Sequence, residues 1–480
     1  MKNITLTILL FSYSFILAQT PCVGGMAGTY PCEGYDLLSH ISFADLDATN
    51  ANDSWGWIDP QDNKEYAIVG LDNGTAFIDI SDPINPVYLG KLPTSTGSTI
   101  FRDIKTYNNY AFIVSDNNGP HGMQIFDLTR LRSVSNPPET FSEDAHYSGF
   151  NNAHNLVINE TEGFAYAVRT NTFGGGIHFI NIQDPLNPVA AGGFSGVYTH
   201  DAQVVTYSGP DPDYAGHEIL ISCNGYDEDV TIVDITDKAN PQAITSFSYT
   251  NSNHAHQGWL TEDHRYFLLG DEADEANTGI NTRTIIFDFE DLDNPTQLSE
   301  YFGPTAAIDH NGYVLGDSYY LANYAAGMRV IDISDIANGN LTESGSFDVY
   351  PPNNVASFNG AFTVYPYFES GNIMISALSY TDNNYPGGFY LVRDSSLGLN
   401  DNSLNTSISI YPNPVKNLLQ IDIKDSVQIT NIRVYDALGR LVLLKEDQFS
   451  SVDVSKISTG LLFIKIETDQ GSVTKKVVKE

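Results

Sequence analysis

The chain has 480 residues, which is enough for one large domain and a smaller one. Aromatic residues make up 12% of it, 28 of them are tyrosines, and long helical patterns are absent, so the composition favours strands. The formal net charge of −36 argues against nucleic acid or an anionic lipid surface as a partner. The charge is uneven, because residues 404–480 carry 10 basic and 9 acidic side chains. The chain therefore has two electrostatically different parts.

Residues 1–18 have the pattern of a secretory signal peptide, in which an apolar run ends at Ala18. The run is too short to span a membrane and nothing later approaches one, so we predict no transmembrane segment. Export would place the chain in a compartment that permits disulfides. Cys22 and Cys32 are ten residues apart and could close a short loop there. Two free thiols are the alternative.

An apolar strand followed by an acidic turn recurs six times in the chain, often with Asn-Pro after the turn. The spacing between copies is 48, 54, 53, 54 and 44 residues, counted between the residues that end the strand: Asp79, Asp127, Asn181, Asp234, Asp288 and Asp332. A unit of this length holds several short strands, which is typical of a β-propeller and too long for one turn of a single-strand solenoid. Proline after the turn suits entry into an edge strand. The repeats predict an all-β propeller.

The first strands of the aligned units have seven starts, at Ser54, Arg102, His154, His200, His256, His310 and Phe358. The last unit has a third strand at residues 388–392 but no outer strand before the polar residues that follow. Residues 35–43 form a strand-like segment that precedes the first unit. We therefore predict a seven-bladed β-propeller over residues 19–394, with the N-terminal strand closing the ring. Such a closure removes an exposed sheet edge.

Residues 395–406 are rich in Asn and Ser and are predicted to be a linker. The alternating pattern of residues 407–480 predicts a small C-terminal β-sandwich. Its segments YPNPVKNLLQI, IRVYDALGRLV, STGLLFIKI and TKKVVK resemble the type IX secretion C-terminal sorting domain. The resemblance implies that the type IX secretion machinery is a partner of this region. It also implies a secreted, extracellular or outer-membrane surface location.

Residues 21–394 resemble the choice-of-anchor B family, which is built from repeats of the LVIVD type. The resemblance rests on the six repeated strands, on Cys22 with the segment 29–32, and on the stretch from His256 to Glu272. It implies a secreted or surface propeller. It supplies no catalytic residues.

Polar residues occupy the starts of the inner strands and the ends of the second strands, which share one face of a propeller. We predict an axial binding face formed by Arg102, Asp103, His154, His200, Asp201, His256, Asp271, Glu272 and His310. Imidazoles with carboxylates are good ligands for Zn, Mn or Fe. A divalent metal ion is therefore a possible cofactor, held by His154, His200, His256 and His310. The alternative for each histidine is a hydrogen bond that fastens its own blade.

Three further histidines, His146, His254 and His264, lie off this register and are expected to be solvated. No Ser-His-Asp or Cys-His nucleophile occurs at a recognisable spacing. The leading hypothesis is a secreted or cell-surface binding module for an unknown extracellular ligand or surface partner. A metal-dependent hydrolase or lyase, in which the axial histidines and carboxylates hold a metal that activates water, is the alternative. A rigid spacer in a surface layer or adhesin is a third possibility.

Overall fold

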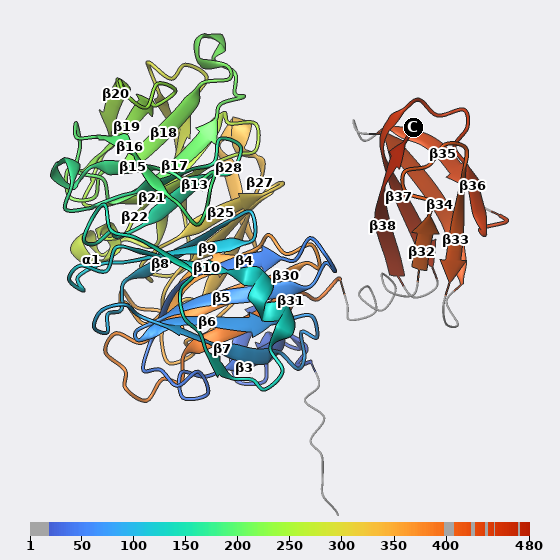
Figure 1. Cartoon of the computed structure of the whole chain (residues 1–480), viewed down its shortest axis with the longest axis horizontal. Helices are drawn as coiled ribbons and strands as arrows, with labels where there is room; N and C mark the ends of the chain where they lie inside the picture. Colours follow the sequence, from blue (N-terminus) through green and yellow to red (C-terminus); the bar gives the residue numbers. More distant parts are fainter. Residues whose placement is uncertain (1–18, 398–407, 424–427, 437–439, 446, 469–470) are drawn as a thin grey trace, which may run out of the picture. The chain divides into compact units, whose positions relative to one another are not determined.

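The structure is a computed structural model that describes residues 19–397, 408–423, 428–436, 440–445, 447–468 and 471–480. It divides into two compact units, Met1–Arg393 and Asp394–Glu480 (Figure 1). The expected signal peptide, and the linker beyond residue 397, lie outside the described residues. Strands dominate both units, and the one α-helix of the described residues is the short α1 (Asp274–Thr278). The all-β prediction is confirmed. Within the same ranges no helix has both the length and the apolar character needed to cross a membrane.

Seven sheets, each with a core of four antiparallel strands, make up the described part of the first unit. The first three contain β4 (Ala51–Ile58), β5 (Glu65–Leu71), β6 (Gly74–Asp79) and β7 (Val87–Pro93); β8 (Arg102–Tyr107), β9 (Tyr110–Ser115), β10 (Met123–Asp127) and β12 (Ala145–Tyr147); and β13 (Leu156–Asn159), β14 (Phe164–Ala167), β15 (Ile177–Asn181) and β16 (Val189–Phe194). The next two contain β17 (Asp201–Thr206), β18 (Glu218–Cys223), β19 (Asp229–Asp234) and β20 (Gln242–Ser248); and β21 (Ala255–Leu260), β22 (Tyr266–Asp271), β23 (Arg283–Asp288) and β24 (Thr296–Phe302). The last two contain β25 (Gly312–Leu315), β26 (Ser318–Ala322), β27 (Met328–Asp335) and β28 (Asn340–Phe347); and β29 (Gly360–Tyr365), β30 (Asn372–Leu378), β31 (Gly388–Asp394) and β3 (Tyr35–Ile41). Short strands extend two of these sheets: β11 (Glu139–Thr140) beside β7, and β2 (Tyr30–Glu33) with β1 (Met26–Ala27) beside β28.

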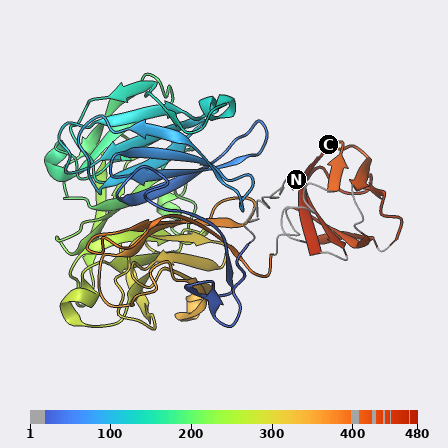
Figure 2. The ribbon, with the colours of Figure 1, turned by 90° about the horizontal axis from the view of Figure 1, so that it is seen from below.

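The first strand of each sheet contacts the first strand of the next, and the contacts run in a closed circle. The order of these inner strands is β4, β8, β13, β17, β21, β25 and β29, after which β29 meets β4 again. Blue strands from the start of the chain and orange strands from residues 360–394 lie side by side in both ribbon views (Figures 1 and 2). Sheets that surround one axis in this way are the blades of a β-propeller.

The ring closes through β3, which is the outer strand of the last sheet and lies beside β31. The backbone N–H of Phe43 donates to Pro386 O at 3.1 Å, and His40 Nε2 lies 2.7 Å from Gly387 O. Gly387 has a φ of 42°, and a Cβ there would overlap the Phe43 ring, so this approach requires glycine. The predicted disulfide between Cys22 and Cys32 is present and confirmed.

The residue that ends each third strand begins a turn, which gives the sequence repeat a structural reason. Its side-chain oxygen accepts a hydrogen bond of 2.8 to 3.0 Å from the backbone N–H two residues later. An amide oxygen serves as well as a carboxylate in this Asx turn. The six residues are Asp79, Asp127, Asn181, Asp234, Asp288 and Asp332.

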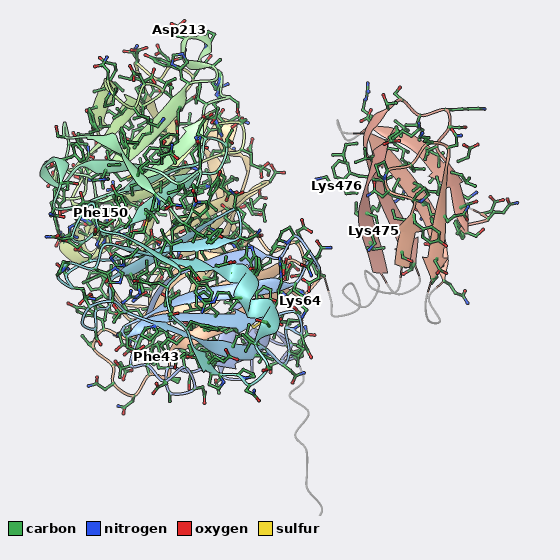
Figure 3. All side chains as sticks on the ribbon, in the orientation of Figure 1. Phe43, Lys64, Phe150, Asp213, Lys475 and Lys476 are labelled. Carbon is green, nitrogen blue, oxygen red and sulfur yellow. A yellow bond between two sulfur atoms is a disulfide. The ribbon has the colours of Figure 1, made fainter. Side chains whose placement is uncertain are left out.

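The apolar residues of the first unit pack between neighbouring sheets. Ala76, Phe77 and Ile78 of β6 are all fully buried although they are consecutive, because both faces of the sheet are covered. The ring of Phe77 stacks on that of Phe126 from the next sheet, with centroids 4.4 Å apart. Side chains occupy the spaces between the strands throughout this unit, whereas Asp213 lies at the tip of a projecting loop (Figure 3).

The second unit is a β-sandwich, as predicted. One sheet contains β32 (Ile408–Tyr411), β33 (Leu418–Ile423) and β36 (Ser451–Asp453), and the other contains β35 (Leu441–Lys445), β34 (Ile429–Asp436), β37 (Gly460–Thr468) and β38 (Gly471–Lys479). Alternate residues of the strands, such as Leu462, Ile464 and Ile466, are buried in one shared core. Lys475 and Lys476 lie next to each other on β38 (Figure 3).

Candidate functional site

Four histidines from the starts of successive inner strands lie together at one end of the ring. The rings of His154 and His200 have centroids 4.4 Å apart, those of His200 and His256 4.7 Å, and those of His256 and His310 4.4 Å. His154, His200 and His310 stand one or two residues before the start of their inner strands, and His256 is the second residue of β21. They line a cavity of about 290 Å³, which we call the histidine pocket.

Glu272, directly after β22, extends into the histidine pocket. Its Oε2 lies 3.6 Å from His254 Nδ1 and 3.7 Å from His256 Nε2, and its Oε1 lies 3.8 Å from His310 Nε2. These separations are too long for direct hydrogen bonds. Oε1 accepts a hydrogen bond of 2.8 Å from Tyr324 Oη, which fixes the carboxylate. One carboxylate thus faces three imidazole nitrogens across a gap.

His254 was expected to be solvated, and this expectation is wrong: its side chain is buried in the histidine pocket. Its ring centroid lies 4.6 Å from that of His200. His254 and His256 are two residues apart, and such residues share one side of an extended chain. The signal was therefore present as His-x-His. His146, by contrast, is exposed, and His264 is half-buried.

Hydrogen bonds through Nδ1 orient two of the imidazoles. His310 Nδ1 lies 2.5 Å from Phe362 O, so this nitrogen donates and Nε2 presents its lone pair to Glu272. His154 Nδ1 lies 3.0 Å from Asp116 Oδ2. The Nδ1 atoms of His200 and His256 are buried without a hydrogen-bond partner.

Burial favours the neutral form of four imidazoles of the pocket. It lowers the pKa of His254 to about 4 and that of His310 to about 3, and it holds the pKa values of His200 and His256 well below their usual range. Burial also raises the pKa of Glu272 to about 7. Neutral imidazole is the form that binds metal ions.

Two residues predicted for the axial face have other positions. Arg102 is buried away from the histidine pocket, where its Nε donates to Leu71 O at 3.2 Å and its Nη1 lies 3.1 Å from His121 Nε2. Asp271 is fully buried and accepts hydrogen bonds from the backbone N–H groups of Asn253 and His254, at 2.7 and 2.9 Å. Asp271 thus positions His254 instead of meeting a ligand.

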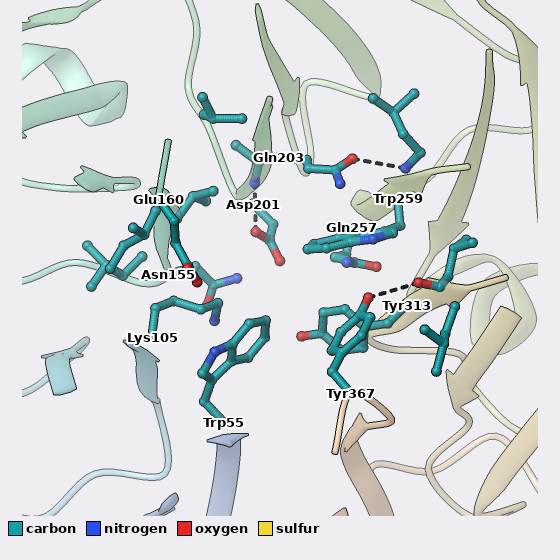
Figure 4. A pocket seen from close by; sticks show the side chains of 18 of the residues that line it. Trp55, Lys105, Asn155, Glu160, Asp201, Gln203, Gln257, Trp259, Tyr313 and Tyr367 are labelled. Carbon is teal, nitrogen blue, oxygen red and sulfur yellow. Dashed lines mark hydrogen bonds between the residues drawn. The ribbon is translucent and has the colours of Figure 1, made fainter. Parts of the chain in front are cut away.

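Asp103 and Asp201 follow the register residues by one position and belong to a different polar cluster. Lys105 Nζ lies 2.6 Å from Asp103 Oδ1 and 3.8 Å from Asp53 Oδ2. Asp201 and Lys105 line a second cavity (Figure 4). Asp53 also lines this cavity. Of the predicted axial residues, the four histidines and Glu272 line the histidine pocket and Asp201 lines the second cavity, whereas Arg102, Asp103 and Asp271 line neither.

Asp201 makes the stability of the propeller depend on pH. Burial and the charge of Asp103 raise the pKa of Asp201 to about 7, from an ordinary value of 3.8. Because the folded chain binds this proton more tightly than the unfolded chain, the carboxyl stabilises the fold at low pH, and this contribution is lost as the pH rises through 7. We expect the unfolding free energy of Asp201→Asn, taken relative to that of the native chain, to rise by about 2–3 kcal/mol between pH 5 and pH 8. Urea unfolding at both pH values checks this, and an unchanged difference would contradict it.

Two family models match the sequence. Residues 409–480 match the secretion system C-terminal sorting domain, and residues 64–94 and 313–349 match the LVIVD repeat. The LVIVD matches cover strands of the first and sixth sheets. No curated protein matches the sequence.

Solved structures are similar at low sequence identity. PorZ of Porphyromonas gingivalis, a surface component of the type IX secretion system, is 10% identical with a TM-score of 0.42 over 93% of this chain and 58% of PorZ. The Cps50 (Swd1) β-propeller domain of Myceliophthora thermophila is 11% identical with a TM-score of 0.43 over 68% of this chain and 93% of that domain. Hydrazine synthase of Kuenenia stuttgartiensis is 11% identical with a TM-score of 0.45 over 68% and 92% of the two chains.

The matches agree with the two units of the structure. The sorting-domain match covers nearly the whole of the β-sandwich, and the repeat matches lie in the propeller. This protein is a β-propeller with LVIVD repeats that ends in a type IX C-terminal sorting domain, and it is secreted to the cell surface or the extracellular space.

Proposed function

We propose that this protein is a surface or secreted binding module that holds one divalent transition-metal ion in the histidine pocket. The observation that supports the proposal is the spacing around Glu272, whose carboxylate oxygens lie 3.6 to 3.8 Å from three imidazole nitrogens. Two ligands that share a tetrahedral ion through bonds of about 2.0–2.1 Å lie about 3.3–3.5 Å apart. The pocket is therefore close to the geometry of a metal site.

The ligands of the ion would be His256, His310 and Glu272, whose candidate ligand atoms all lie within 4.8 Å of one another. His254 Nδ1 lies 3.6 Å from Glu272 Oε2, beside this set of three ligands and not within it. Imidazole-rich sites favour Zn²⁺ or Cu²⁺ over Ca²⁺ or Mg²⁺, which prefer oxygen ligands. The carbonyl of Phe362, which orients His310, is the kind of outer partner that metal-bound histidines have.

The rest of the pocket leaves room for a ligand beside the ion. Tyr226, Phe358 and Tyr380 line the cavity of about 290 Å³ together with the histidines. Tyr226 and Tyr380 are largely exposed, so they lie where a ligand would enter. We infer that a small molecule, or one side chain of a partner protein, completes the coordination.

Metal binding can be measured directly on the full chain. We expect the protein, stripped with a chelator and dialysed, to bind about one Zn²⁺ or Cu²⁺ per chain in calorimetric titration and to retain it through gel filtration with elemental analysis. Ca²⁺ and Mg²⁺ serve as controls and should not bind at this site. The proposal is wrong if neither transition metal binds stoichiometrically.

A further inference from the structure

A second cavity, of about 520 Å³, lies at the end of the ring where the inner strands finish. It takes residues from the first strands of six sheets and from the residues after β29 (Figure 4). On β21, for example, His256 lines the histidine pocket, whereas Trp259 and Leu260 line this cavity. We call it the aromatic cavity. It is distinct from the proposed metal site, and none of its lining residues is a proposed metal ligand.

One wall of the aromatic cavity is built from Trp55, Trp259, Tyr313 and Tyr367 (Figure 4). Tyr313 packs edge-to-face against both tryptophans, with centroids 5.9 Å from Trp55 and 4.9 Å from Trp259. Tyr367 Oη donates to Val314 O at 3.0 Å, which fixes its ring. The wall is therefore a preformed apolar surface, and three of its four side chains are only partly buried.

The facing wall is polar and carries both donors and acceptors (Figure 4). Gln203 Oε1 accepts a hydrogen bond of 2.9 Å from the backbone N–H of Leu260, and this bond fixes the side chain beside Asp201. Asn155 and Lys105 add donors, and Glu160 adds an exposed carboxylate. Lys105 Nζ also lies 4.7 Å above the Trp55 ring.

The two walls together select the chemical class of the ligand. Buried Asp201 and the nearby carboxylates disfavour an anion, while Lys105, which already occupies the face of Trp55, disfavours a cation. A neutral molecule with one apolar face and many hydroxyl groups satisfies both walls, since hydroxyls donate and accept. We propose that the aromatic cavity binds a neutral saccharide of one or two rings, stacked on the aromatic wall. Its volume falls in the usual range of small-molecule sites.

Tryptophan fluorescence provides a direct test, because two of the three tryptophans of the chain line the cavity. The full-length protein would be titrated with cellobiose, maltose, lactose and N,N′-diacetylchitobiose, and with choline and galacturonate as charged probes. We expect a saturable change in emission with at least one neutral disaccharide. Trp259→Ala should weaken this binding by at least about tenfold.

Control variants separate the cavity from the rest of the molecule. Trp57→Phe alters the third tryptophan, which lies outside the cavity lining, and should leave the affinity unchanged. Glu272→Gln alters the proposed metal site and should also leave saccharide affinity unchanged, so the two proposals can fail separately. Asn155→Ala tests the polar wall if Trp259→Ala does not fold. A response to choline or galacturonate alone, no response to any neutral disaccharide, or an unchanged affinity in both cavity variants would overturn the proposal.

Discussion

Replacing His256 with alanine is expected to lower the affinity of the protein for Zn²⁺ or Cu²⁺ by at least about 100-fold. His256 Nε2 lies 3.7 Å from Glu272, and its ring is adjacent to those of both His200 and His310. Its removal would therefore take one ligand from the middle of the cluster. Competition with a chelator of known affinity measures the change.

Two further variants make the metal experiment specific. Tyr324→Phe removes only the hydroxyl that holds Glu272 and should weaken binding by about tenfold, the smaller effect of an outer partner. His217→Ala removes a partly exposed histidine that directly precedes β18, pairs with Asp234 and does not line the histidine pocket, so it should leave the affinity unchanged. Equal losses in His217→Ala and His256→Ala would indicate nonspecific binding and contradict the site.

Replacing Arg283 with methionine is expected to destabilise the propeller by about 3–5 kcal/mol, because it leaves buried acids without their counter-charge. Arg283 is only 2% exposed. Its Nε donates to Asp274 Oδ2 at 2.6 Å, and its Nη1 lies 3.2 Å from Glu300 Oε1. The same guanidinium donates to the backbone oxygens of Thr250 and Asn251, which precede the segment that carries His254.

A surface arginine in the same sheet provides the matched control. Arg265 pairs with Asp288 and Glu290, but about a third of its side chain is exposed. Arg265→Met should therefore cost at most about 1 kcal/mol. Urea unfolding of both variants measures the difference. Comparable losses in the two variants would show that burial of Arg283 has no special effect.

The fold was largely predictable, because the repeat has a local cause. An Asx turn requires an oxygen at one position, so residues such as Asp79 and Asn181 mark the third strands in the sequence. The role of residues 35–43 was predictable for a different reason. The last repeat unit lacked an outer strand in the sequence, and residues 35–43 formed a strand-like segment that belonged to no unit. The family models match the repeats and the sorting domain that the sequence resembled.

The site was only partly predictable, because register indicates the strand end at which a side chain lies but not its direction. His154 and Arg102 occupy equivalent positions, yet Arg102 turns toward Leu71 and His121. Asp271 and Glu272 are neighbours in the sequence, but Asp271 binds backbone N–H groups while Glu272 faces the imidazoles. The aromatic wall was not predicted, because Trp55, Tyr313 and Tyr367 come from parts of the chain that only the closed ring brings together.

The position of β3 has a consequence for maturation. The last sheet is complete by Asp394, the residue at the boundary between the two units, and β31 is already covered by β3. If a protease cut the chain after that boundary, the propeller would lose no strand, and β31 would gain no uncovered edge at which a second molecule could pair. Because β3 completes the last sheet, the propeller is expected to keep its fold if the C-terminal sorting domain is removed.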